Sequence, residues 1–374
     1  MLREEFHLDS FPDNRIWVKF NENFRKKFFE KIRFKEINKL FKNSLVYSTF
    51  QQWKRGVCSI PLWFILKISR YLEIPIIELE KNILSYQGPS TSTPILYPKL
   101  PLLEDNRVVR LVTHILCDGW VSGSAGTNLP KGKGPSGYRN FNKTLIDNFE
   151  NDLSVFGEFK LDKDYGHGHI LFPNVIQYIL EKIYKIKFST FEGRLPKRFW
   201  NLDEELVKEV IKAFGDDEGH VYDHNIDFYS MNKFLISDLR SLLKHKFSEM
   251  KVSKIKTNLH SARNPKYSFS ILSNSFPAFR KEIGFCHPLK MKDLEYNVDR
   301  MSIKQSKIKG LTKGKILDLL KNERLSAKEL SRRTNVCHAQ ALWHLNNLKK
   351  QGKVEIVEKG KFNTNVWGLN NVIN

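Results

Sequence analysis

"LVTHILCDGWV" (111–121) and "IKAFGDDEGHV" (211–221) share one plan: an apolar helical run ends in an acidic residue that is followed by glycine. Asp118 and Glu218 occupy the equivalent position, about one hundred residues apart. Apolar residues at three- and four-residue spacing are typical of a helix with one buried face. Two such helices, each opening a similar stretch of chain, predict an internal repeat that decides the fold.

The segments after each acid support the repeat. Polar, glycine-rich strands follow Asp118, and then come a helix in "NKTLIDNFENDLSVFG" (142–157), a strand in "GHGHILF" (166–172) and a helix in "NVIQYILEKIY" (174–184). After Glu218 the same order is given by "GHVYDHNIDFYS" (219–230), "NKFLISDLRSLLKHKF" (232–247), "KYSFSIL" (266–272) and "SFPAFRKEIGF" (275–285). The chain is therefore expected to be an α+β protein with two pseudo-symmetric αββαββα repeats.

The composition indicates a nucleic-acid partner. Lys and Arg number 62 against 41 Asp and Glu, a net charge of +21, and a charge of this size and sign favours a polyanion. A lysine-rich proteome is the alternative explanation. The four cysteines form no CxxC pair, so neither a zinc ribbon nor a disulfide framework is expected. No apolar stretch reaches about 18 residues, and we expect a cytoplasmic protein without membrane contact.

The first 88 residues are expected to form an all-α domain, followed by a Gly-, Ser-, Thr- and Pro-rich linker over 89–104. "WKRGVCSIP" (53–61) ends one short helix and starts another. This segment resembles the helix-turn-helix of the lambda repressor and Cro family. The resemblance implies that the major groove is contacted by Tyr47, Ser48, Thr49, Gln51 and Gln52, and that phosphates are contacted by Lys54 and Arg55. A helical bundle used only for packing or dimerisation is the alternative.

The pattern of residues 301–374 predicts three amphipathic helices and a hairpin, with a capping box of Ser326 and Glu329 at the start of one helix. This order resembles a winged helix. The segment holds 15 Lys and Arg against 5 Asp and Glu, which is +10 of the total +21, and so favours DNA contact. Groove contacts are expected from His338, Gln340 and His344, and backbone contacts from Arg332, Arg333 and Lys361. A winged helix that binds a protein partner is the alternative.

The two opening motifs resemble those of the LAGLIDADG homing endonucleases in their single-chain, two-motif form. The first motif aligns over 111–119 and the second over 211–219, which gives repeats over 105–198 and 199–300. "RLPKRFW" (194–200) and "FRKEIGFCHPLKMKDL" (279–294) are also typical of the family in character. The resemblance implies paired motif helices with limited bulk at their contact, to which Ala213 and Gly215 would contribute.

The same resemblance implies that Asp118 and Glu218 are the catalytic, metal-binding residues of an endonuclease. Negative charge at a helix carboxyl end costs about 0.3–1 kcal/mol per group, and converging carboxylates repel further. Two or more Mg²⁺ ions between these acids would offset that repulsion and support hydrolysis of one bond in each DNA strand. Base readout by two saddle-shaped sheets is expected to involve Tyr138, Arg139, Asn225, Asp227, Tyr229, Lys256, Arg263 and Lys266.

Family members usually carry a basic residue before the last helix of each repeat. The second repeat offers Lys266 or Ser270, and the first offers His167 and His169, which could bind a metal but more simply form an exposed strand end. Asp216 and Asp217 are expected to be a solvated helix end. The alternative functions are a transcriptional regulator derived from such an endonuclease and an RNA-splicing maturase, whereas an intein lacks support in the sequence. We expect a monomer that binds double-stranded DNA.

Overall fold

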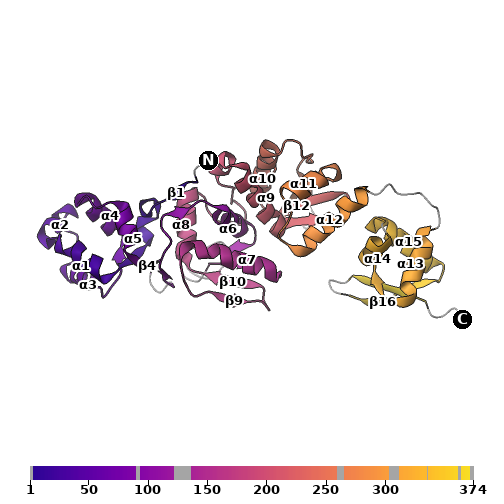
Figure 1. The fold of residues 1–374 in the computed structure, drawn as a ribbon, viewed down its shortest axis with the longest axis horizontal. Coiled ribbons are helices and arrows are strands. Elements are labelled where there is room, and N and C mark those ends of the chain that lie inside the picture. Colours follow the sequence, from indigo (N-terminus) through magenta and orange to yellow (C-terminus); the bar gives the residue numbers. More distant parts are fainter. Residues whose placement is uncertain are drawn as a thin grey trace.

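The computed structural model describes residues 3–89, 93–121, 136–258, 265–302, 311–334, 336–360 and 364–370. The predicted α+β class is confirmed, since many helices surround several small sheets. An N-terminal unit, a central unit and a C-terminal unit follow one another along the longest axis (Figure 1). Among the described helices, none combines the length and the apolar character that crossing a membrane requires.

The central unit contains one succession of helices and strands twice, and one additional helix follows the second copy. Its first half comprises α6 (Asn106–Cys117), β7 (Gly119–Trp120), β8 (Ser136–Arg139), α7 (Lys143–Leu153), β9 (Asp162–Asp164), β10 (His169–Phe172) and α8 (Asn174–Tyr184). Its second half comprises α9 (Glu204–Glu218), β11 (Gly219–Val221), β12 (Asn225–Ser230), α10 (Lys233–Lys246), β13 (Lys256–Asn258), β14 (Lys266–Leu272), α11 (Phe276–Glu282) and α12 (Pro288–Ser302). The sheets have equivalent strand orders, β7-β8-β10-β9 and β11-β12-β14-β13.

Helices α6 and α9 pack against each other in the middle of the central unit. Each begins at an aspartate cap: the Asp105 carboxylate accepts from the amides of residues 107 and 108, and Asp203 accepts from the amide of residue 206. Their apolar positions are buried, among them Val108, Leu111, Val112 and Ile115 in α6 and Val207, Val210, Ile211 and Phe214 in α9. The contact brings the carboxyl ends of the two helices together.

Both motif glycines are required by a close backbone approach. A Cβ atom at Gly119 would lie 2.6 Å from the Ile115 carbonyl oxygen, and one at Gly219 would lie 2.4 Å from the Gly215 carbonyl oxygen. Gly215 itself has a different role from the one expected. A Cβ atom there would meet the ring of Phe285 at 2.9 Å, so this glycine makes room for an aromatic side chain of its own repeat.

The N-terminal unit is not all-α, which corrects the prediction. Helices α1 (Glu22–Glu30), α2 (Phe34–Leu40), α3 (Tyr47–Arg55), α4 (Leu62–Tyr71) and α5 (Ile76–Lys81) accompany a sheet of order β3-β2-β4-β5. The strands are β2 (Trp17–Phe20), β3 (Ile60–Pro61), β4 (Ile83–Gln87) and β5 (Ile95–Leu96). Ile16, Val18 and Phe20 are buried at alternate positions, the period of a strand.

The segment 89–104 contributes to the core and is more than a linker. Ile95 in β5 is fully buried, and β6 (Leu102–Leu103) pairs with β1 (Glu5–Phe6). One continuous hydrophobic core therefore extends from Phe6 to Leu294 through the N-terminal and central units. The glycines and prolines indicated turns, but the apolar residues between them are buried.

The C-terminal unit has a core of its own, which includes Ile316, Leu330, Leu345 and Trp367. Its elements are α13 (Leu311–Asn322), β15 (Leu325–Ser326), α14 (Ala327–Thr334), α15 (His338–Lys350), β16 (Val354–Lys359) and β17 (Asn365–Leu369), with sheet order β15-β17-β16. The predicted capping box is confirmed: the Ser326 amide donates to the Glu329 carboxylate (2.8 Å), and the Glu329 amide donates to the Ser326 hydroxyl (3.2 Å).

Candidate active site

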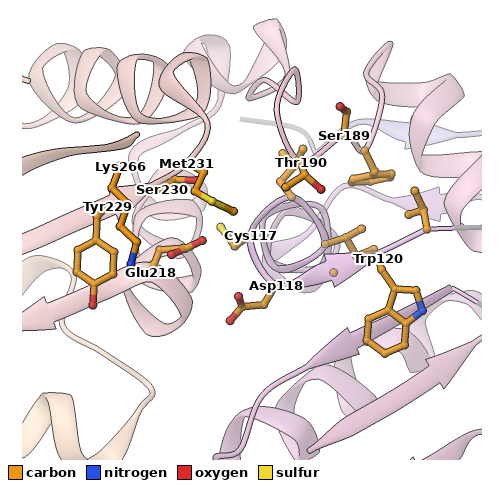
Figure 2. A pocket seen from close by; sticks show the side chains of 15 residues that line it. Cys117, Asp118, Trp120, Ser189, Thr190, Glu218, Tyr229, Ser230, Met231 and Lys266 are labelled. Carbon is orange, nitrogen blue, oxygen red and sulfur yellow. The ribbon is translucent and has the colours of Figure 1, made fainter. Parts of the chain in front are cut away.

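Asp118 and Glu218 share one cavity at the joined ends of α6 and α9. Asp118 directly follows α6, and Glu218 is the last residue of α9. Both line a cavity of about 310 Å³, together with Cys117 and Lys266. The carboxylates of Asp118 and Glu218 border the same cavity, and they come from the adjacent ends of α6 and α9 (Figure 2). The structure thus brings together the two acids that the sequence paired.

The two carboxyl groups are in an environment that disfavours their charged forms. Burial, and next the charge of Asp217, raise the pKa of Asp118 to about 7. Burial, and next the charge of Asp118, raise the pKa of Glu218 to about 8. Among the residues that the structure describes, neither carboxylate has a hydrogen-bonding or ion-pair partner. The charge of Asp118 therefore makes ionisation of Glu218 more costly.

This donor set fits a hydrated divalent cation. Carboxylate oxygens are hard ligands of the kind that Mg²⁺ binds, and Mg²⁺ keeps several of its waters when only one or two carboxylates hold it. The described residues contain no cluster of three or more His, Cys, Asp or Glu around one point, so Asp118 and Glu218 would be the protein ligands. A cation would supply the positive charge that the buried pair lacks.

Asp216 and Asp217 are buried, which corrects the expectation of a solvated helix end. The Asp216 carboxylate accepts from the backbone amides of Cys286 (3.1 Å) and His287 (2.8 Å). The Asp217 carboxylate lies 2.8 Å from Nδ1 of His114 and accepts from the hydroxyl of Tyr138 at 2.6 Å. Asp217 thus connects its own helix to α6 and β8 of the other repeat.

His114 is the counterpart of Asp217 across the helix pair. Its side chain is 4% exposed and that of Asp217 is fully buried. Burial alone lowers the pKa of His114, but the surrounding carboxylates, Asp217 first, together outweigh burial, and the net shift of the pKa is upward. The pair is a buried, charge-assisted contact between the two repeats.

Lys290 is a residue of the site that the sequence did not reveal. It lies in the first turn of α12, and its Nζ donates to the carbonyl oxygens of Gly215 (3.0 Å) and Asp216 (2.5 Å). It is 74 residues from Asp216 in the chain, so no local periodicity could have pointed to it. The signal available was only a lysine within "HPLKMKDL" (287–294).

The two repeats differ in the basic residue that each has at the equivalent strand position near the cavity. Lys266 at the start of β14 lines the cavity on the side of Glu218 (Figure 2). Strand pairing identifies the equivalent residue in the first repeat. Gly119 pairs with Tyr138 and Tyr138 with Ile170, just as Gly219 pairs with Phe228 and Phe228 with Phe269. Ile170 therefore corresponds to Phe269, and His167 corresponds to Lys266. His167 is exposed, and its Nδ1 lies 2.7 Å from the Asp164 carboxylate.

The central DNA-contact candidates are distributed unevenly over the surface. Tyr138 is fully buried and bound to Asp217, so the expectation that it reads bases is wrong. Arg139, Lys256 and Lys266 are exposed, and Asn225, Asp227 and Tyr229 are half-buried on β12. Arg263 lies outside the described residues.

The candidates of the flanking units lie mostly at the surface. On α3, Ser48, Gln52, Lys54 and Arg55 are exposed, while Thr49 and Gln51 are half-buried. On α15, His338 and Gln340 are exposed and His344 is half-buried. Arg333 pairs with Glu323 at 2.7 Å, and Arg332 pairs with Asp293 of α12. Lys361 lies outside the described residues.

No family model and no curated protein matches the sequence. Full-length DUF199/WhiA from Thermatoga maritima is similar over 66% of this chain and 90% of its own, at 11% identity and a TM-score of 0.33. I-DmoI in complex with DNA and Mn is similar over 48% of this chain and 96% of its own, at 16% identity and a TM-score of 0.33. Mesophilic variants from the homing endonuclease I-DmoI are similar over 51% and 97%, at 15% identity and a TM-score of 0.32. At TM-scores this low, the likenesses support no inference about function.

Proposed function

We propose that the protein is a sequence-specific, Mg²⁺-dependent endonuclease of the LAGLIDADG type that cuts both strands of double-stranded DNA. The observation that supports this proposal is the convergence of Asp118 and Glu218 in one cavity, without any partner among the described residues. Carboxyl groups whose pKa is raised by burial and by nearby acids, as for Asp118 and Glu218, are typical of a functional site. Bound Mg²⁺ would polarise the scissile phosphate and activate water for in-line attack.

The roles of the chain's own residues follow from their positions. Asp118 and Glu218 would hold the cation, one at each helix end. Lys266 would bind a phosphate oxygen beside Glu218, because its ammonium is a mobile point charge at the cavity wall. Exposed Arg139 and Lys256 on the two sheets would contact the DNA backbone, and the net charge of +21 would attract the duplex.

A transcriptional regulator without cleavage activity is the second candidate. The observation that favours it is that exposed polar residues lie on α3 and α15, in units at opposite ends of the molecule. Base contacts from these two helices would give sequence-specific binding without hydrolysis.

The test uses the full chain and a target selected from a random DNA library. We expect plasmid carrying this target to be cut with Mg²⁺, and Asp118→Asn and Glu218→Gln to abolish cutting while binding in Ca²⁺ stays within about threefold of wild type. Asp162→Asn and Glu249→Gln, which change exposed acids, are the controls. Tight binding of the target with no cutting in Mg²⁺ or Mn²⁺ would contradict the endonuclease proposal and favour the transcriptional regulator.

A further inference from the structure

The carboxyl end of α9 carries an unusual concentration of negative charge. Asp216, Asp217 and Glu218 are consecutive there, and the helix dipole adds about half a negative charge at the same end. Burial prevents water from screening these groups, since Asp216 is 2% exposed and the Asp217 side chain is fully buried. A structure of this kind needs a compensating group close to the last turn of the helix.

Lys290 supplies that group. Its ammonium donates to the carbonyl oxygens of Gly215 and Asp216 and lies 3.5 Å from the Asp217 carbonyl oxygen. Lysine at a helix carboxyl end satisfies carbonyls that have no partner inside the helix. Burial lowers the pKa of Lys290, and the surrounding carboxylates, Asp217 first, oppose that shift. The ammonium is thus bound to the end of α9, and the Lys290 side chain is half-buried.

The same end of α9 is held from a second direction. The amides of Cys286 and His287 donate to the Asp216 carboxylate, four and three residues before Lys290 in the chain. The start of α12 therefore binds a side chain and the backbone of the last turn of α9 at once. Glu218 follows directly, so its position depends on this double contact.

Helix α6 ends differently. Its Asp118 carbonyl oxygen accepts a backbone hydrogen bond from the Arg139 amide at 3.2 Å. The carbonyl oxygens of residues 115 and 116, which correspond to those that Lys290 binds in α9, accept no hydrogen bond from a lysine within the described part of the chain. The ends of the two helices are therefore held differently, and the ammonium contact is found on the side of Glu218.

We propose that Lys290 is a positioning residue, whose ammonium fixes the last turn of α9 and so places Glu218 for binding of a divalent cation. It acts through Glu218 and does not itself bind the cation. The cation-binding role of Glu218 comes from the proposed function, and the proposal about Lys290 rests on it.

Calorimetric titration of the full chain with Ca²⁺ at about pH 8.5, without DNA, tests this role. We expect Lys290→Met to weaken Ca²⁺ binding by about tenfold or more, as loss of an outer-shell support does in metal sites. Lys290→Arg keeps the donors and the charge and should remain within about threefold of wild type. Lys292→Met, an exposed lysine two residues further along α12, is the matched control and should bind as wild type does.

Charge alone predicts the opposite result, since removal of a nearby cation would strengthen Ca²⁺ binding. Unchanged or tighter binding by Lys290→Met, an equal loss in Lys290→Arg, or a wild type that binds no Ca²⁺ would overturn the proposal. If Lys290→Met does not fold, Lys290→Gln takes its place with the same criterion. If wild type binds Ca²⁺ but cuts no DNA, the endonuclease proposal is contradicted, whereas the proposal that Lys290 positions Glu218 is not affected.

Discussion

At the scale of single residues, three neighbouring acids have three different tasks. Successive helix positions point about 100° apart, so Asp216, Asp217 and Glu218 face three separate environments. Asp216 binds the amides before α12, Asp217 binds His114 and Tyr138 of the other repeat, and Glu218 lines the cavity. Only the last of the three remains without a partner among the described residues, which makes it the one available to a ligand.

The raised pKa of Glu218 makes stability depend on pH. The folded protein holds at this site, up to about pH 8, a proton that the unfolded chain releases near the ordinary value of 4.5. Stability from this group is therefore lost as pH rises between those values. The side chain of Glu218→Gln stays neutral at every pH. Without divalent cations, the free energy of unfolding of this variant should therefore exceed that of wild type by about 1–3 kcal/mol near pH 8.5 and by much less near pH 4.5.

Urea unfolding with a chelator present, at both pH values, measures this difference. Glu249→Gln, at an exposed position, serves as the control and should show no such trend. A stabilisation by Glu218→Gln that does not change with pH would contradict the pKa shift. Added Mg²⁺ should stabilise wild type near pH 8.5 and leave the variant unchanged.

At the scale of elements, α6 and α9 are joined by charge as well as by apolar packing. Arg110 of α6 donates to the Asp152 carboxylate of α7 at 2.6 and 2.8 Å, and to Glu209 of α9 at 2.7 Å. The Asp152 side chain is only 1% exposed. A single guanidinium therefore neutralises two acids from two other helices, one of them in the opposite repeat.

Removal of Arg110 should be costly. Arg110→Met leaves Asp152 buried without its cation, and loss of one partner from such a pair destabilises by about 3–5 kcal/mol. Arg110→Met combined with Asp152→Leu should recover most of that loss, because no buried charge remains. Urea unfolding of the two variants at neutral pH tests this expectation, and equal stability of the single and double variants would contradict it.

The elements that sequence could predict are those whose signal is local. Apolar spacing located α6 and α9, and the acid-glycine endings located Asp118 and Glu218, because periodicity and chain reversal depend on near neighbours. The strands of the N-terminal unit were missed, since β2 is short and its partners come from far along the chain. The roles of Asp217 and Lys290 were missed for the same reason, since their partners lie on elements far along the chain. Charge at a helix end looks solvated until the fold covers it.

At the scale of the whole molecule, α12 contacts both the candidate active site and the C-terminal unit. Lys290 is bound to α9, while Asp293 of the same helix pairs with Lys328 and Arg332 of α14. The Tyr296 hydroxyl donates to the Ser331 carbonyl oxygen at 2.8 Å, and the His338 amide donates to the Asp223 carboxylate at 2.6 Å. Two residues proposed to contact DNA, Arg332 and His338, are thus engaged by acids of the central unit.

DNA must compete with these acids if the C-terminal unit binds it through Arg332. Asp293→Asn removes the competing carboxylate, so we expect non-specific duplex binding to tighten about three- to tenfold at about 0.1 M salt, and amide exchange in α14 to speed up. Glu295→Gln on the same helix removes the same charge, but Glu295 makes no ion pair with α14 within the described residues. The smaller tightening of duplex binding expected for Glu295→Gln measures the contribution of net charge alone. Equal tightening by the two variants in a fluorescence anisotropy titration would show that the contact between α12 and α14 does not restrain DNA binding.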